Sequence, residues 1–488
     1  MKVDENIVDD IESLIEKLQN DNEVAYAEVG AIFRDKSIIS SAGDDIKRCS
    51  EISDSGVWCR VFADGAAGYR YIQDPESVSR IGSLALKRAQ VLGQSTPAHY
   101  DTITAHEGSH TGWVTNKRNT DVDIDKKANA VRRGIERLED PQNTRIYYED
   151  VSRDDIRLTT TGGRIRTSID RNWIDIRGSV DTQDGVQIKI NQQAGSTLGF
   201  KDSADDLIDT TTRKLSEQRS RLSNHTTVSE SGAKTATLSS SVAGQLFHQL
   251  SRYLEMDTIY FGSSLADIGD KITSSLICIN DTVEPGNWAA IGFDGEGKMA
   301  SPTRLIDDGI VKNRLHSTVT ALEENNQPKG NFIASTKLDS PPRIHVRHLD
   351  VKPGSTLIED MLNESEVYIS SVGTPTLANE ATKTKQSSYM PPCALYAKDI
   401  ADKTPKNYVD EASNQALRFP ITEGYTLENG EKRELVSNTS LVIALDDFQT
   451  ISKLGLQRST IDGIHKKNDS QIPFSVTSPP ITLNIELK

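Results

Sequence analysis

The stretch RIYYEDVSRDDIRLTTTGGRIRTSIDRNWIDIRGSV, residues 145–180, decides the fold class. Charged and apolar residues alternate along it, and a two-residue period is typical of strands that bury one face. The pair Gly162-Gly163 interrupts the alternation and predicts a turn. The stretch therefore predicts neighbouring strands of one sheet, with strand-like alternation continuing to residue 200.

Helical patterns lie on both sides of these strands. Apolar residues recur at helical spacing in residues 7–19, and further helices are expected at residues 75–92, 123–138 and 204–222. Residues 23–71 carry β-rich runs, and Asp64-Gly65 predicts a tight hairpin turn. We therefore predict an α+β protein whose N-terminal domain, residues 1–225, combines an antiparallel sheet with amphipathic helices.

The remaining residues, 226–488, are predicted to form a β-rich C-terminal domain that carries one prominent helix around His248. The run Ser239-Ser240-Ser241 is interpreted as the N-cap region of that helix, because hydroxyl groups accept hydrogen bonds from free backbone N–H groups. One strand is expected at residues 304–317. Residues 382–414 lack any lasting period and are predicted to be an irregular insertion.

Composition excludes several classes of protein. The 488 residues are 35% hydrophobic and 26% charged, and no run of eighteen apolar residues predicts a membrane span. A net charge of −15 repels a phosphate backbone and argues against direct nucleic-acid binding. The N-terminus lacks the basic start and apolar core of a secretion signal, so a cytoplasmic protein is expected.

The helix sequence GQLFHQLSRYLEMD, residues 244–257, looks like a zinc-protease helix that has lost most of its catalytic groups. His248 is followed by Gln249, where a hydrolase of this kind carries a glutamate. An ionised glutamate takes a proton from metal-bound water, whereas a neutral amide cannot. His248 alone is also compatible with a partly buried histidine that only packs.

Six segments in order resemble the TldD/PmbA family, whose members are known as modulators of DNA gyrase and as zinc-dependent metalloproteases. The resemblance covers most of the chain. The segments are SDSGVWCRVFADGAAGY (53–69), VAGQLFHQL (242–250), GFDGEG (292–297), LIDDGIVKNRLHSTVTA (305–321), RFPITEGYTLENGE (418–431) and GIHKKNDSQIPF (463–474).

The resemblance implies a zinc site made of an HExxxH helix and a cysteine close to the C-terminus. Matched to this sequence, the first histidine is His248, the glutamate is replaced by Gln249, the second histidine falls at Tyr253 and the cysteine at His465. Imidazole and thiolate both bind zinc, but neutral tyrosine is a poor ligand and glutamine a poorer base. The cofactor is therefore either none or zinc held by His248 and His465.

The chain contains further histidines that are candidate metal ligands. The literal HExxH at residues 106–110 lies among threonines and glycines that disfavour a helix, so a solvated loop is expected. His345 and His348 are assigned to one strand, where residues three apart point to opposite faces, so they are not expected to share an ion. His316 is expected at the surface, and the FDGEG turn offers acids only by weak analogy.

Three functions remain open. The resemblance implies two-subunit particles, often with one zinc-bearing and one zinc-free chain, so the leading hypothesis is an inactive or weakened subunit. Such a chain would help form a peptide-processing cavity with an active partner, as a heterodimer or homodimer that takes unfolded peptides. The alternatives are a divergent zinc metallopeptidase that uses His248, His465 and a third ligand, and a peptide-binding or scaffolding protein.

Overall fold

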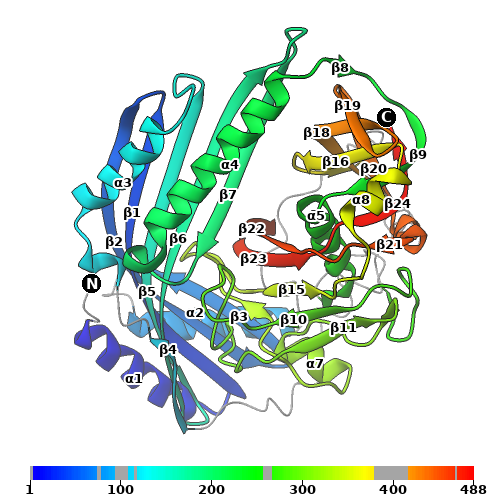
Figure 1. Ribbon diagram of the computed structural model, residues 1–488. Coiled ribbons are helices and arrows are strands. Elements are labelled where there is room, and N and C mark those ends of the chain that lie inside the picture. The colour runs from blue at the N-terminus through cyan, green and yellow to red at the C-terminus, as the bar shows by residue number, and fades with distance from the viewer. Residues whose placement is uncertain are drawn as a thin grey trace.

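The computed structural model describes residues 4–73, 78–93, 108–114, 118–256, 266–377, 416–467 and 470–488. It confirms the α+β class, with separate sheets in the two halves of the chain (Figure 1). The predicted insertion at residues 382–414 lies outside the described residues. Within the described part, no helix combines the length and hydrophobicity needed to cross a bilayer.

The first half of the chain forms a seven-stranded sheet with the strand order β3-β2-β1-β5-β6-β4. The last strand, β7, pairs with β6 beyond the part that pairs with β4. Asp64 and Gly65 both have positive φ, which confirms the predicted tight turn between β2 and β3. The strand bounds are β1 Tyr26–Ala42, β2 Asp45–Ala63, β3 Ala66–Ile72, β4 Gly108–Val114, β5 Thr144–Thr159, β6 Gly163–Asp181 and β7 Gln187–Ser196.

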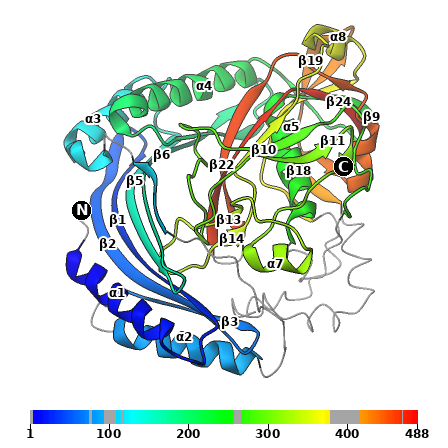
Figure 2. The same cartoon turned by 90° about the horizontal axis from the view of Figure 1, so that it is seen from below.

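Two pairs of helices cover one face of this sheet, at opposite ends of its long strands (Figure 2). The odd-numbered apolar residues of β1, from Ala27 to Ile39, contact them because side chains alternate across a strand. The four predicted helices are confirmed to within a few residues. Their bounds are α1 Glu5–Gln19, α2 Val78–Gly93, α3 Ile124–Glu136 and α4 Asp205–Ser223.

The other face of the sheet turns toward the second half of the chain. Even-numbered residues of β1 and odd-numbered residues of β5 and β6 lie on this face, and many of them are charged. Arg60 of β2 is 2.8 Å from Glu296 of the second half and 2.9 Å from Glu28 of β1. This buried charge cluster joins the two halves.

Two sheets make up most of the second half. One is six-stranded, with the order β12-β11-β10-β15-β23-β22. In the nine-stranded sheet, an additional pairing of β16 with β18 closes the path β16-β9-β24-β20-β18 into a ring. The bounds are β8 Thr227–Val228, β9 Gly232–Leu238, β10 Ile279–Thr282, β11 Thr303–Asp307, β12 Ile310–Val311, β13 Phe332–Ile333, β14 Arg343–Ile344, β15 His348–Val351, β16 Val367–Val372, β17 Thr376–Leu377, β18 Leu417–Glu428, β19 Glu431–Val436, β20 Ser440–Ile443, β21 Lys453–Leu454, β22 Ser459–Lys467, β23 Ser470–Ser478 and β24 Ile481–Leu487.

The prediction of one strand at residues 304–317 is wrong. Asp308 and Gly309 both have positive φ and turn the chain, so β11 and β12 pair antiparallel as a hairpin. The pair Asp-Gly is a strong hairpin signal. Short helices α7 Thr318–Glu323 and α8 Ile358–Asn363 follow in the second half.

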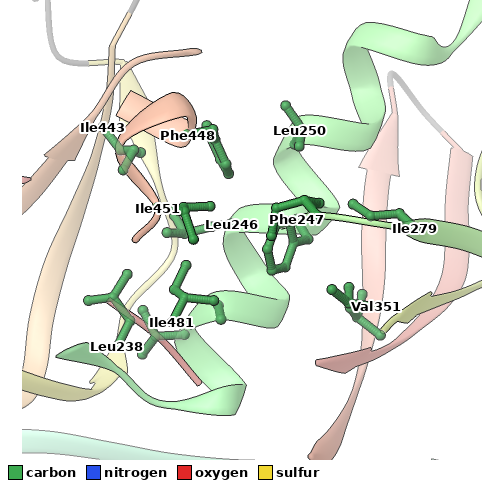
Figure 3. Close-up of a cluster of buried hydrophobic side chains, with 14 of the residues drawn as sticks. Leu238, Leu246, Phe247, Leu250, Ile279, Val351, Ile443, Phe448, Ile451 and Ile481 are labelled. Atoms are coloured by element: carbon green, nitrogen blue, oxygen red, sulfur yellow. The ribbon is translucent and has the colours of Figure 1, made fainter. Parts of the chain in front are cut away.

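Helix α5, Ser240–Ser251, lies inside the second half, between strands of the two sheets. Its apolar side chains Leu246, Phe247 and Leu250 are at most 1% exposed and face side chains such as Ile279, Val351 and Ile481 (Figure 3). A helix buried in this way is held by packing on most of its surface. The position of α5, and of its buried side chains, is therefore tightly fixed.

Candidate functional site

Helix α5 brings His248 against the hairpin of β22 and β23. Ser239 caps the helix by accepting a hydrogen bond from the N–H of Val242, as predicted. Gly244 permits close approach, since a Cβ atom there would lie 3.2 Å from the Ile461 side chain of β22. One turn further on, the His248 ring stacks on Phe474 of β23 at a centroid distance of 3.6 Å. His248 is only 3% exposed.

Three histidines meet at this point. His248 comes from α5, His465 from β22, and His345 from the residue after β14. One nitrogen of each ring lies within 4.8 Å of the others, and the Nε2 atoms of His248 and His345 are 3.2 Å apart. The ring centroids of His248 and His465 are 5.2 Å apart. We refer to His248, His345 and His465 as the histidine cluster.

A buried ion pair orients the third member. The Nδ1 atom of His345 is 2.5 Å from one oxygen of Glu255, and the Nζ atom of Lys467 donates to the other oxygen at 2.6 Å. Burial raises the pKa of Glu255, but the charges of Lys467 and His345 outweigh it and hold the pKa below its usual range. The ionised carboxylate accepts from Nδ1–H and leaves Nε2 of His345 facing the cluster.

The other two rings are uncharged at neutral pH. Burial, followed by the nearby His345 and His465, lowers the pKa of His248 well below its ordinary value. Burial, with His345 and Arg252, lowers the pKa of His465 to about 2. Neutral imidazoles carry the lone pairs that a metal ion needs.

The structure also describes Gln249 and Tyr253, the other two residues of the predicted site. The amide nitrogen of Gln249 lies 3.4 Å from Nδ1 of His248, and Arg252 donates to its amide oxygen at 3.3 Å. Helix α5 ends at Ser251, so Tyr253 falls in a 3₁₀ turn, η4 Arg252–Leu254, and packs against the hydrophobic core. Burial raises the pKa of Tyr253, which favours the neutral phenol.

The donors of the cluster fit zinc. Two ligands held about 2.0–2.1 Å from one tetrahedral zinc lie about 3.3 Å apart, close to the 3.2 Å between Nε2 of His248 and Nε2 of His345. Nε2 of His465 is buried and has no hydrogen-bond partner among the residues that the structure describes. The contact of His345 with Glu255 is the carboxylate–histidine pairing common around zinc. Bound zinc would polarise a carbonyl group and acidify a water molecule.

His345 is the residue that sequence reasoning missed. The prediction assigned it and His348 to one strand, but β14 ends at Ile344 and β15 begins at His348. His345 and His348 do not share a site, as expected, because His348 contacts Asn287 and Thr477. The proximity of His345 to His248 depends on contacts between segments about a hundred residues apart, which a periodic pattern cannot reveal.

The remaining candidates lie elsewhere. Of the HExxH segment, His106 and Glu107 lie outside the described residues, and the expected loop is wrong for residues 108–110, which begin β4. His316 is 2% exposed rather than at the surface, and burial lowers its pKa to about 4. In the FDGEG turn, burial and the neighbouring Glu296 raise the pKa of Asp294 to about 6.

Comparison with known proteins agrees with this architecture. The sequence profile of the PmbA/TldA metallopeptidase C-terminal domain matches residues 231–387, which include His248 and His345. A metalloprotease of Methanothermobacter thermautotrophicus is 24% identical over 353 residues, 70% of this chain and 76% of the relative. One of Methanocaldococcus jannaschii is 21% identical over 437 residues, 88% of this chain and 89% of the relative.

The matching profile and these relatives support the resemblance of this chain to the TldD/PmbA family. Among solved structures, a candidate DNA gyrase modulator of Thermotoga maritima superposes with a TM-score of 0.73 at 16% identity, covering 99% of this chain and 100% of the other. TldE of Thermococcus kodakarensis gives a TM-score of 0.68 at 14% identity, covering 98% and 99%. At these identities the two structures show that the TldD/PmbA fold is shared.

Proposed function

We propose that this TldD/PmbA chain is a metalloprotease homologue with little or no peptidase activity of its own, which acts as a subunit beside an active zinc-bearing partner. One observation carries the proposal: the carboxylate nearest the histidine cluster, Glu255, is bonded on both oxygens, to His345 and to Lys467. Its lowered pKa makes it a weak base. Gln249 supplies only an amide.

A general base contributes about 10²–10⁴-fold to the rate of hydrolysis. The purified chain, loaded with one equivalent of zinc, should therefore not cleave an unstructured fluorogenic peptide. Gln249→Glu should gain at least about 10²-fold over the wild type, because it restores a carboxylate beside His248. Gln245→Glu is the matched control: the same exchange one helical turn away should bring no gain.

Robust cleavage by the wild-type chain would contradict this proposal if a chelator stops the reaction and added zinc restores it. The subunit role has a separate test. Affinity purification of the tagged chain from its native cell should yield a second TldD/PmbA chain that carries the complete HExxxH helix. Recovery of a homodimer alone would contradict the role beside an active partner and would favour a scaffolding function.

The second candidate is a divergent zinc metallopeptidase, and the third nitrogen supplied by His345 favours it. Under this hypothesis the isolated chain binds about one zinc, measured by elemental analysis after dialysis. His345→Ala and His465→Ala should each lose the metal, whereas His348→Ala, a histidine outside the cluster, should retain it. Two variants that keep full zinc would eliminate the cluster as a metal site.

A further inference from the structure

A second feature lies on the opposite side of the β22–β23 hairpin from the histidine cluster. It is a cavity of about 810 Å³ between the charged face of the N-terminal sheet and the second half of the chain. Ile464 and Gln471 form part of its wall, and Ile464 faces away from its neighbour His465 because side chains alternate along β22. The cavity is therefore separate from the candidate zinc site.

The lining of this cavity is basic, although the chain as a whole carries a net charge of −15. Its acidic members are Glu149 and Asp339. Its basic members are Arg34, Lys36, Arg153, Arg171 and Lys337. A concave surface of one sign focuses the electric field and attracts a ligand of the opposite sign.

Most of these cations already have a carboxylate partner. Arg34 pairs with Asp54, Lys36 with Glu149 at 2.6 Å, and Arg153 with Asp155 at 2.8 Å. Lys337 and Asp339 are both exposed, so water screens their charges. The charge that matters most in the cavity is therefore that of Arg171.

Arg171 of β6 has no acidic partner within the described residues. Its guanidinium donates to the carbonyl oxygens of Trp288 and Ala290, at the long distances of 3.3 and 3.5 Å. Burial, reinforced by Arg153 and partly offset by Asp155, which is bonded to Arg153, lowers its pKa to about 10, and this still leaves it charged at neutral pH. A largely buried charge without a counter-ion is costly, and a bound anion removes that cost.

The walls beside Arg171 are aromatic. Its guanidinium carbon lies 5.9 Å from the centre of the Trp288 ring, and the rings of Trp288 and Trp173 are 4.9 Å apart. Pockets of about 300–1,000 Å³ with apolar walls and a few placed polar groups are typical ligand sites. A guanidinium fork suits a planar carboxylate, which it binds through two parallel hydrogen bonds.

We propose that this cavity is a recognition site for a peptide carboxylate, in which Arg171 binds the carboxylate and the Trp173–Trp288 wall packs against the adjacent residue. That the ligand is a peptide rests on the proposed function; that it carries a carboxylate rests on Arg171 alone. The C-terminus of a peptide and an acidic side chain both supply such a carboxylate, and the peptides described next distinguish the two.

Calorimetric titration of the full chain with three acetylated pentapeptides tests this proposal. The first is an alanine peptide with phenylalanine as its penultimate residue and a free C-terminal carboxylate. The second ends in an amide instead, and the third is amidated with glutamate as its last residue. The free acid should bind at least about tenfold more tightly than the neutral amide. Binding of the glutamate peptide distinguishes a side-chain carboxylate from a terminal one.

Arg171→Gln should reduce the affinity for the free acid to that for the amide, and Arg171→Lys should retain part of the difference. Arg166→Gln is the matched control, an exposed arginine five residues away on the opposite face of β6. Equal binding of acid and amide, an unchanged difference in Arg171→Gln, or no binding of any peptide would overturn the proposal. All titrations contain a chelator and measure binding without turnover. Their outcome is therefore independent of whether the proposed function is correct.

Discussion

At the scale of single residues, this chain separates metal-binding chemistry from acid–base chemistry. The histidine cluster presents three nitrogen donors, and both oxygens of the neighbouring carboxylate, Glu255, are already bonded, one to His345 and one to Lys467. A metal ligand needs a lone pair, whereas a general base needs a free oxygen of suitable pKa. Among the described residues the cluster meets the first requirement, whereas Glu255, bonded on both oxygens, does not meet the second.

Asp462 provides a pH-dependent prediction at this scale. Burial raises its pKa to about 6, although Ser475 and the N–H of Gly195 donate to its oxygens at 2.8 and 3.1 Å. The folded state thus binds a proton more tightly than the unfolded state, whose pKa is near 3.8. The stability due to this proton is full below pH 4 and is lost as the pH rises through 6.

Asp462→Asn should therefore become more stable relative to the wild type, by about 1–3 kcal/mol, between pH 4 and pH 7. Urea denaturation at both pH values measures the difference. Asp184→Asn should behave in the opposite sense and in a lower window: it should become more stable relative to the wild type as the pH falls from 4 to 2, because hydrogen bonds from Thr182 and Thr227 lower the pKa of Asp184 to about 2. A constant difference for Asp462→Asn would show that its carboxyl group is not perturbed by folding.

At the scale of elements, helix α2 packs in direct backbone contact with strand β3 of the N-terminal sheet. Gly68 of β3 lies beneath α2, where an added Cβ would be 1.9 Å from the carbonyl oxygen of Ala85. Backbone atoms cannot give way as a flexible side chain can. Gly68→Ala should therefore destabilise the protein by about 3 kcal/mol, measured as the free energy of unfolding in urea.

A suitable comparison is Gly185→Ala. Gly185 has a φ of +80° but nothing within 4 Å of an added Cβ, so only backbone strain of about 1 kcal/mol is expected. If Gly68→Ala costs no more than Gly185→Ala, α2 must be able to shift away from β3 without loss of packing.

At the scale of the whole molecule, the buried cluster of Arg60, Glu28 and Glu296 couples the two halves. All three side chains are at most 7% exposed, and Glu296 also accepts a hydrogen bond from the N–H of Thr318 at 2.5 Å. Arg60→Leu leaves two carboxylates buried without their cation. It should destabilise the protein by about 3–5 kcal/mol, again measured by urea denaturation.

A double variant distinguishes the effect of the unpaired charge from the effect of lost packing. Arg60→Leu combined with Glu296→Gln removes one of the orphaned charges, so the double variant should recover part of the lost stability. If the double variant is as unstable as the sum of the two single variants, the ion pair contributes no coupling between the halves.

The elements of the N-terminal half were readable from the sequence because their patterns are local. Helices α1 to α4 follow an apolar period of 3.6 residues, and the capping role of Ser239 depends only on the residues that follow it. The prediction of a single strand at residues 304–317 is wrong, although the Asp308-Gly309 turn that divides it is an equally local signal.

The sequence by itself determined the α+β class, the resemblance to the TldD/PmbA family and the presence of an amide, Gln249, after His248, since each depends on residue identity and short-range order. Only the tertiary structure decided that His345 joins His248 and His465, that Glu255 pairs with Lys467, and that Arg171 lines a basic cavity without forming an ion pair within the described residues. The physical reason is that these contacts join segments from about a hundred to more than three hundred residues apart. Their geometry is set by the packing of α5 and by the pairing of distant strands, which no periodicity along the chain encodes.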